Sequence, residues 1–483
     1  MEALNIIDGS ISTPPSPTPV DDPGNLKDPV GVVGETSSRD IEAAIQAAHV
    51  AFPSWAKQSP RERADYFDAL AHVIEDRLPA WADLLTREHG KLRKESIWDL
   101  EGAVRILRYY QTVVDTYHWS TDYFTSVGTI RYFRAPTGVT AIIVPWNYPI
   151  HLSFLMMVPA LLAGNTVVVK PATLVPLTVS AILTECATLL PPGVLNVING
   201  SGNGVGQLLV SHPKVRRVAL TGGTETGRIV MRTAADSLKK ISMELGGNDP
   251  AILLEDVRLD DRLYEEIAAG VFTSTGQICL NIKRIYVHRA RYYEFVQGFR
   301  EHMQYYRVGY GLEAQSDMGP LNNLNQVQWI SSLLQEARDM GAAVEELGQY
   351  TKWVEQHDGY YMLPTLVTNV SHQARIVTEE QFGPVVPIIP FSSWDEAVSL
   401  ANSTEYGLAS SIWTENPDKA FQLAECLEAG STFINIHRVG ASGVDQPFGG
   451  VKQSGIGRGH GLVAIDEATE LHTIIHRHDV ITR

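Results

Sequence analysis

Cysteine is scarce in this sequence of 483 residues, which holds only Cys186, Cys279 and Cys426. An odd, sparse set excludes a disulfide framework of the kind that staples small secreted domains. No Cys-x-x-Cys pair and no cysteine–histidine cluster has the spacing of a zinc site. The sequence therefore predicts no structural disulfide and no bound metal.

Charged residues are also few, at 19% of the chain, and acidic residues outnumber basic ones, which gives a formal net charge of -16. An acidic chain repels phosphate backbones and anionic lipids, so neither nucleic acid nor a membrane surface is an expected partner. A small-molecule substrate is not excluded, because a local pocket can differ in sign from the whole.

One long run lacks charge entirely. Residues 138–169 contain no Asp, Glu, Lys or Arg, and their length alone would allow a membrane span. Prolines and a Gly–Asn pair interrupt this run, so a buried strand, loop, helix and second strand explain it better. The first ten residues show neither the basic region nor the apolar core of a secretory signal. We therefore expect a cytoplasmic protein.

The C-terminal run LHTIIHRHDV holds His472, His476 and His478, which even spacing would place on one face of a strand. Such a face resembles a metal tract. No carboxylate or cysteine joins the histidines there, so a strand with a polar side is the preferred interpretation.

Strand-like and helix-like segments alternate along most of the chain, whose length requires two or three domains. Helical segments separate four β-rich runs, at residues 139–145, 165–171, 193–200 and 215–223. This order predicts an α/β fold with a parallel, doubly wound sheet, whose ligands bind beyond the carboxyl ends of the strands. A second α/β block has strand-like runs at 251–256, 283–288, 384–391 and 432–436.

The stretch STGQICLN, residues 274–281, sets Cys279 among small and polar residues. A structural cysteine usually has bulky apolar neighbours, and a disulfide needs a partner. This setting therefore indicates a thiol that a ligand can reach, and a reachable thiolate is a nucleophile. Cys186 and Cys426 lie in helical segments of mixed apolar character and are expected to serve packing.

Polar groups and glycines recur where the predicted strands end. In TGGTETG, residues 221–227, glycines would let the backbone approach a phosphate. Lys170 could contact a ribose or phosphate, and Asn147, between two prolines, could donate its amide to an oxyanion. Glu244 lies in an apolar run, where desolvation raises a carboxyl pKa toward the range of a general base. Each feature has a structural alternative, such as a tight turn or a surface lysine.

Seven segments occur together in one order: VPWNYP, VVVKPAT, TGGTETG, MELGGND, STGQIC, EEQFGPV and PFGGVKQSGIGR. With them the chain resembles the aldehyde dehydrogenase superfamily over nearly its whole length. The resemblance implies an enzyme that oxidises an aliphatic, aromatic or semialdehyde substrate to the acid with NAD or NADP. The reaction would pass through a thiohemiacetal and a thioester on cysteine.

The resemblance also implies residue roles. Cys279 would be the nucleophile, Glu244 the general base that activates water, and Asn147 the oxyanion donor. Lys170 would contact the adenosine ribose and Glu380 the nicotinamide ribose. Further residues expected beside the cofactor are Trp146, Thr173, Gly222, Gly223, Gly227 and Phe382. Those expected along the aldehyde tunnel are Tyr148, Leu155, Ile278, Leu280, Arg438 and Phe448.

By the same resemblance the chain has a Rossmann-type cofactor domain, an α/β catalytic domain and a small β-ribbon for oligomerisation. The cofactor domain is expected at residues 1–117 and 137–247, and the catalytic domain at 248–446. The ribbon is expected at residues 118–136 and 465–483. Such a ribbon implies a homodimer or a homotetramer.

Two positions depart from the family pattern near the expected cofactor. Gly223 stands where many members have Ser, which removes one hydroxyl donor. Thr173 stands where relatives that prefer NAD often have Glu, whose carboxylate binds the ribose hydroxyls and repels a 2′-phosphate. Thr173 beside Lys170 therefore predicts that NADP is tolerated.

The substrate and the reaction each keep an alternative. The expected tunnel is largely apolar, which suits aliphatic or aromatic aldehydes. Arg438 could instead bind the carboxylate of a semialdehyde, or it is a surface arginine paired with Asp445.

The nearest rival function is a CoA-acylating enzyme, against which Glu244 argues because a water-activating base serves hydrolysis. Two further rivals are a non-catalytic protein of this fold and a cofactor-independent cysteine hydrolase.

Overall fold

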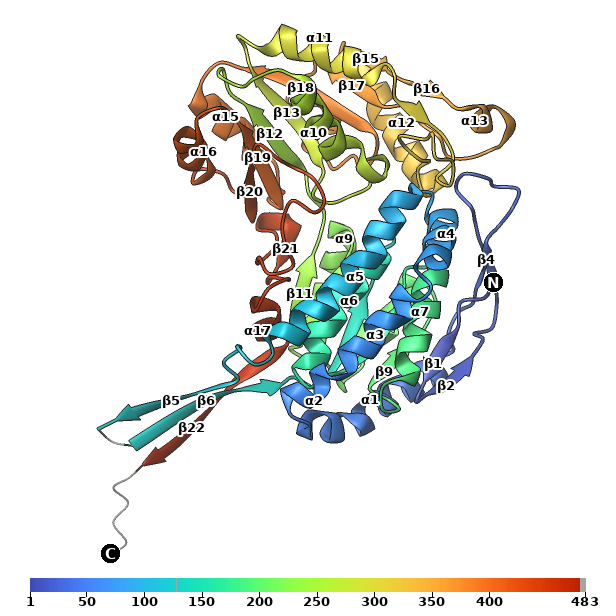
Figure 1. Cartoon of the computed structure of the whole chain (residues 1–483), viewed down its shortest axis with the longest axis vertical. Coiled ribbons are helices and arrows are strands. Elements are labelled where there is room, and N and C mark those ends of the chain that lie inside the picture. The colour runs from blue at the N-terminus through green and yellow to red at the C-terminus, as the bar shows by residue number, and fades with distance from the viewer. Residues whose placement is uncertain (127, 478–483) are drawn as a thin grey trace, which may run out of the picture.

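Two α/β bodies and a projecting ribbon make up the protein (Figure 1). The computed structural model describes residues 1–126 and 128–477. Strand and helix labels below follow Figure 1.

The lower body is built on an eight-stranded sheet of order β2-β1-β9-β8-β7-β10-β11-β21. In that order the strands are Ser10–Ser12, Asn5–Ile7, Leu195–Val197, Thr166–Lys170, Val139–Ile143, Val215–Thr221, Lys240–Glu244 and Gly455–Ile456. Strands β9, β8, β7, β10 and β11 pair in parallel, while β1 and β21 flank them antiparallel. The predicted doubly wound parallel sheet is confirmed.

Helices cover both faces of this sheet. One face carries α2 (Pro60–Ala64), α3 (Tyr66–Glu75), α4 (Leu78–His89), α5 (Arg93–Val113), α6 (Pro149–Leu162) and α7 (Leu177–Thr188). The other carries α1 (Ser38–Lys57), α8 (Gln207–Ser211) and α9 (Thr224–Ala235). The uncharged run 138–169 forms β7, a loop, α6 and β8, as predicted. Among the described residues, no helix is both long and apolar enough to cross a bilayer.

The upper body holds a seven-stranded sheet of order β15-β17-β18-β13-β12-β19-β20. These strands are Ala343–Glu346, Thr365–Thr368, Val385–Phe391, Ile282–His288, Asp249–Leu253, Ala409–Trp413 and Ser431–Ile434, and β15 alone pairs antiparallel. Helices α10 (Asp261–Phe272) and α11 (Tyr292–Met303) pack on one face. The other face carries α12 (Leu324–Asp339), α14 (Arg375–Thr378), α15 (Trp394–Ala401) and α16 (Pro417–Ala424). Small flanking elements are β3 (Thr18–Val20), β4 (Gly31–Val33), β14 (Arg307–Val308), β16 (Gln349–Tyr350) and α13 (Lys352–Gln356).

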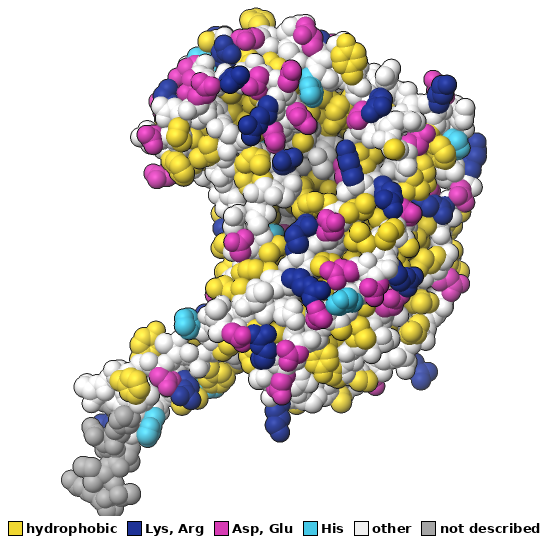
Figure 2. Space-filling view, viewed as in Figure 1, with side chains coloured by type: hydrophobic (Ala, Val, Ile, Leu, Met, Phe, Trp, Pro, Cys, Tyr) yellow, Lys and Arg dark blue, Asp and Glu magenta, His cyan; other side chains and the backbone are white. Residues whose placement is uncertain are grey.

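The ribbon is a three-stranded antiparallel sheet that extends away from both bodies (Figure 1). Its strands are β5 (Ser120–Thr125), β6 (Gly128–Pro136) and β22 (Thr469–Arg477), and α17 (Val463–Glu467) precedes β22. The ribbon exposes apolar side chains, among them Phe124 at 82% and Ile475 at 70%. On the face in Figure 2, acidic and basic side chains are interspersed over both bodies.

The three cysteines are all free, and two of them are not catalytic candidates. Cys186 is fully buried in α7, as packing requires. The prediction for Cys426 was wrong, because α16 ends at Ala424 and Cys426 lies exposed in the turn beyond it.

Candidate functional site

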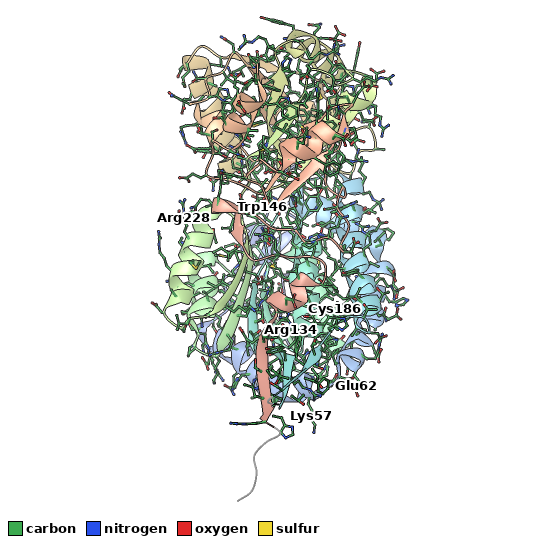
Figure 3. All side chains as sticks on the ribbon, turned by 90° about the vertical axis from the view of Figure 1, so that its left-hand side faces the viewer. Lys57, Glu62, Arg134, Trp146, Cys186 and Arg228 are labelled. Carbon is green, nitrogen blue, oxygen red and sulfur yellow. The ribbon has the colours of Figure 1, made fainter. Side chains whose placement is uncertain are left out.

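Two cavities open where the order of the first sheet reverses. From β7 the chain continues to β8 and β9 on one side, whereas β10 and β11 lie on the other. The carboxyl ends of β7 and β10 therefore form the switch point at which ligands bind in open α/β sheets. Cavities of about 540 Å³ and 410 Å³ meet there, and both are lined by Asn147, Thr221 and Cys279. Trp146, labelled in Figure 3, lies at the junction of the two bodies.

Cys279 lies in a short loop between the turn η2 (Thr273–Gly276) and β13. Ser274 and Thr275 adopt left-handed φ values of 54° and 59°, which bulky residues rarely adopt. Glu95 on α5 holds the first of them, since its Oε1 accepts a hydrogen bond from the Ser274 amide at 2.7 Å. Gln277 is fully buried and donates back to the Ser274 carbonyl at 3.1 Å. The loop is thus fixed on both sides of its turn.

The Cys279 thiol is surrounded by protein yet reaches the cavities, as the composition of STGQICLN indicated. Burial, followed by the charge of Glu380, raises its pKa to about 12, whereas Lys283 acts to lower that pKa. In this state the sulfur is a thiol rather than a thiolate at neutral pH.

Asn147 follows β7, and its amide Nδ2 donates to the carbonyl of Gln277 at 3.1 Å. The amide therefore faces the loop that carries Cys279. Lys91, fully buried, donates from Nζ to the Asn147 carbonyl at 2.9 Å and to the Asp99 carboxylate at 2.7 Å. Asp99 in turn accepts from the His151 amide at the start of α6. A buried ion pair thus holds the turn on which the amide is mounted.

Glu244 ends β11 and faces the larger cavity. Its Oε2 is buried and has no hydrogen-bond partner. Burial raises the pKa of this carboxyl well above its usual range, and the attraction of Arg458 offsets only part of the rise. An unpartnered carboxyl oxygen beside a nucleophile has the free acceptor site that a general base needs.

The smaller cavity is a cleft lined by residues that the sequence assigned to a cofactor: Trp146, Gly222, Gly223, Glu380 and Phe382. Gly223 is the N-cap of α9, and nothing lies within 4 Å of where its Cβ would be. Backbone N–H groups at such a helix start favour an anion. Burial raises the pKa of Glu380 to about 7. The cleft therefore has an open, glycine-lined helix start of the kind that an anionic group such as a pyrophosphate requires.

Three predicted cofactor residues do not line this cleft. Gly227 lies within α9, where a Cβ would come within 2.6 Å of Leu245, so its role is close packing. Lys170 ends β8 as predicted, but it is buried and donates to the Pro171 carbonyl at 3.0 Å. Burial lowers its pKa to about 8. Thr173 is exposed, and its hydroxyl donates to the Gly200 carbonyl at 3.0 Å.

The larger cavity takes in all six residues assigned to the aldehyde tunnel: Tyr148, Leu155, Ile278, Leu280, Arg438 and Phe448. Among the other lining residues, which sequence reasoning missed, are Trp98, Arg105, His151 and His460. Burial lowers the pKa of His151 to about 3 and that of His460 to about 4, so both are neutral at pH 7. Aromatic rings and neutral imidazoles thus surround the path to the sulfur.

Comparison with known proteins identifies the family. The profile of the "Aldehyde dehydrogenase family" matches residues 12–474. The 2-aminomuconic semialdehyde dehydrogenase of Bos taurus is 34% identical over 453 residues, 92% of each chain. The chain belongs to the aldehyde dehydrogenase family.

Solved structures agree with this assignment. Betaine aldehyde dehydrogenase from Staphylococcus aureus, solved with NAD+, superposes with a TM-score of 0.94 at 30% identity, over 99% of this chain and 95% of that one. A structure described as an E. coli NADP dependent enzyme gives 0.93 at 30%, over 99% and 98%. The protein is an NAD(P)-dependent oxidoreductase that oxidises an aldehyde to the acid. Nothing in these relatives points to a CoA-acylating enzyme.

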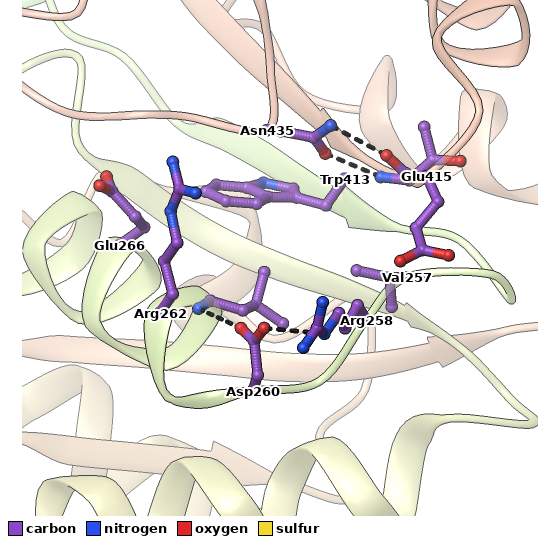
Figure 4. Close-up of a pocket in the computed structure, with 10 residues that line it drawn as sticks. Val257, Arg258, Asp260, Arg262, Glu266, Trp413, Glu415 and Asn435 are labelled. Carbon is purple, nitrogen blue, oxygen red and sulfur yellow. Dashed lines mark hydrogen bonds and ion pairs between the residues drawn. The ribbon is translucent and has the colours of Figure 1, made fainter.

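One alternative from the sequence paired Arg438 with Asp445. In this aldehyde dehydrogenase Arg438 instead pairs with another carboxylate. Its Nε lies 3.3 Å from the Glu266 carboxylate on α10. Glu266 also lines a neighbouring surface cavity of about 640 Å³, between α10 and β19 (Figure 4). The Arg438–Glu266 ion pair therefore lies between this surface cavity and the larger cavity that Cys279 lines.

The histidines of β22 gather no metal ligands in the described part of the chain. His472 packs its ring against Phe133 at 4.7 Å, and no cluster of three or more His, Cys, Asp or Glu able to hold a metal occurs among the described residues. His478 lies outside them.

Proposed function

We propose that Cys279 is the nucleophile, Asn147 the oxyanion donor and Glu244 the general base of this aldehyde dehydrogenase. The meeting of the two cavities at Cys279 carries the proposal. One cavity has the glycine-lined helix start that suits a dinucleotide, and the other has the aromatic wall that suits an aldehyde. A sulfur at their junction can react with a carbonyl carbon while a cofactor lies on its other side.

The reaction then follows from the groups at hand. The Cys279 thiolate bonds to the carbonyl carbon, and Asn147 donates to the oxygen as it gains negative charge. Bound NAD(P)+ supplies the acceptor for the hydride. Loss of hydride leaves a thioester on Cys279. Glu244 takes a proton from water, the hydroxide adds to the thioester carbon, and the acid leaves as the thiolate reforms.

The cofactor would be held by side chains from both bodies. The pyrophosphate would lie at Gly222 and Gly223, and the nicotinamide ribose beside Glu380, near Trp146 and Phe382. Lys170 and Thr173 lie further along the same sheet edge, where the adenosine ribose is expected. We propose that both nucleotides are accepted, because Thr173 brings no carboxylate to that edge.

For the substrate we propose a semialdehyde that carries a distal carboxylate. Arg105 and Arg438 line the same cavity as Cys279, and their side chains are 44% and 48% exposed, so both guanidinium groups reach its open end. The apolar wall would hold the chain between the carboxylate and the aldehyde. Arginine binds carboxylates with two parallel hydrogen bonds.

Three further assignments stay proposals. Residues 1–117 and 137–247, which supply the first sheet apart from β21, would be the cofactor domain, and residues 248–446, which supply the second sheet, the catalytic domain. The ribbon would join subunits into a homodimer or homotetramer through its exposed apolar strands. A cytoplasmic location is supported by the free state of all three cysteines.

Replacing Glu244 and Cys279 separately tests the roles. Glu244→Gln should still form the thioester, so one equivalent of NAD(P)H appears in a burst and steady turnover falls at least about 100-fold. Cys279→Ser should show neither burst nor turnover, and Cys426→Ser should match the wild type. Full aldehyde oxidation by Cys279→Ser would overturn the proposal.

A further inference from the structure

Lys283 is buried beneath the loop that carries Cys279. It lies in β13, four residues after the thiol, and is 1% exposed. Its ammonium donates to the carbonyl oxygens of Ile278, of Asn281 at 3.4 Å and of Cys279 at 3.5 Å. The Phe382 ring lies 5.7 Å from Nζ. A positive charge is therefore fixed against the short loop that carries the nucleophile.

The other charged groups that act on the thiol are all carboxyls. Glu380, Asp249 and Glu244 each disfavour a thiolate, and Lys283 favours one. Asp249 in addition faces His437, whose Nε2 lies 3.6 Å from its carboxylate. Burial raises the pKa of both glutamates, so their repulsion weakens near neutral pH.

Lys283 is itself held in its charged form by the same anions. Burial lowers its pKa, but Glu380, Asp249 and Cys279 all act to raise it. Three carbonyl oxygens also accept its protons, and such contacts favour an ammonium over a neutral amine. Lys283 is the one cation among the groups whose charges act most strongly on the thiol, within the described part of the chain.

We propose that Lys283 stabilises the Cys279 thiolate in the enzyme before the nucleotide binds. The inference rests on the proposed role of Cys279 as the nucleophile. Lys283 thereby sets the fraction of enzyme that is ready to attack an aldehyde. It does so by charge, and its hydrogen bonds to the loop keep that charge close to the sulfur.

The test measures the thiol itself, without nucleotide or turnover. The rate at which iodoacetamide alkylates Cys279 is followed from pH 6 to 10 by peptide mass spectrometry, in folded protein. Lys283→Met and Lys283→Gln should each lower the alkylation rate about tenfold or more across this pH range, which corresponds to a rise of about 1 or more in the thiol pKa. Lys283→Arg keeps the charge and should be alkylated at the wild-type rate or faster.

Two controls separate charge from structure. Exposed Cys426 reports on reagent and pH in every sample and should not change. Lys239 is likewise buried and donates to two backbone carbonyls, at 2.7 and 2.8 Å, in the other body, so Lys239→Met should leave the Cys279 profile unchanged.

A wild-type profile in Lys283→Met would overturn the proposal. A wild-type profile in Lys283→Gln together with a changed profile in Lys283→Met would also overturn it, because Gln keeps a hydrogen-bond donor for the loop but carries no charge. If neither neutral variant folds, Lys283→Arg decides, since an alkylation rate below that of the wild type contradicts a role of charge and a rate at or above it supports that role. None of these outcomes depends on aldehyde oxidation. Failure of the proposed function would instead be seen as full aldehyde oxidation by Cys279→Ser, so the two failures can be told apart.

Discussion

Buried charges behind the reaction centre fix its geometry at the scale of single residues. Lys91 and Asp99 are both fully buried, and they tie Asn147 to the start of α6. A buried pair adds little stability over an apolar pair, but loss of one partner leaves a charge uncompensated. Lys91 also lies 4.1 Å from the centre of the Tyr148 ring. The pair therefore specifies where the amide and the ring lie.

Glu35 brings a carboxylate near Lys170, at the sheet edge where we propose that the adenosine ribose binds, and so would weaken NADP binding without excluding it. Its carboxylate oxygens accept from the amide and hydroxyl of Ser201, both at 2.8 Å, and its charge acts on Lys170. A carboxylate here would repel a 2′-phosphate. We expect Glu35→Gln to lower the Michaelis constant for NADP several-fold and to change that for NAD little. Equal shifts for both nucleotides, measured by steady-state kinetics, would contradict this role.

Arg438 tests the proposed substrate class. Arg438→Ala should lower kcat/KM for succinic semialdehyde by at least about tenfold, because one charge-assisted contact is lost, and should leave benzaldehyde nearly unchanged. Glu266→Gln is the matched variant, since it releases the same arginine from its ion pair and should favour the semialdehyde. Equal effects on both aldehydes would remove the carboxylate role.

The sequence predicted residue types at the site better than their contacts. Cys279, Asn147 and Glu244 lie in short segments whose composition is itself informative. Lys91 and Lys283 were missed, because nothing in their local sequence shows that tertiary folding buries them beside the site. The partner of Arg438 was missed for the same reason, since Glu266 lies on a helix far away in the sequence.

At the scale of elements, the turn before Cys279 depends on a close approach of two chain segments. Gly276 has φ 74°, and a Cβ there would lie 2.1 Å from the Gly383 carbonyl oxygen. We expect Gly276→Ala to cost more than about 2 kcal/mol in unfolding free energy, from backbone strain and overlap together. It should also slow alkylation of Cys279.

Gly341→Ala is the matched control for that turn. Gly341 has φ 88°, but nothing lies within 4 Å of its Cβ position. Its variant therefore reports backbone strain alone, and chemical denaturation should show the smaller loss. Equal losses for the two variants would mean that the contact with Gly383 is not decisive.

Element types followed from the sequence more reliably than element limits. The alternation of strand and helix predicted the first parallel sheet and the presence of a second α/β block, because a strand buried on both faces has a continuous apolar run. Helices α2, α3 and α4 follow one another so closely that apolar periodicity alone does not separate them. Cys426 looked like a packing residue because a helix end cannot be located from periodicity alone.

At the scale of the whole molecule, the ribbon is the feature that a single chain leaves unexplained. Leu471, Ile474 and Ile475 on β22 are 58%, 47% and 70% exposed. Exposed apolar strands of this kind mark an interface. We expect Ile475→Asp to lower the oligomeric mass seen by light scattering. Tyr293→Asp, at an 84% exposed position on α11, is the control and should not. An unchanged mass for Ile475→Asp would place the interface elsewhere.

The two cavities also bear on the order in which products depart. The cleft at Gly223 and the aromatic cavity share only Asn147, Thr221 and Cys279 among their lining residues, so we expect each ligand to leave through its own cavity. The acid can then dissociate before the reduced nucleotide, and the nucleotide can dissociate before the acid. Relative affinity, rather than obstruction, would then decide which departs first.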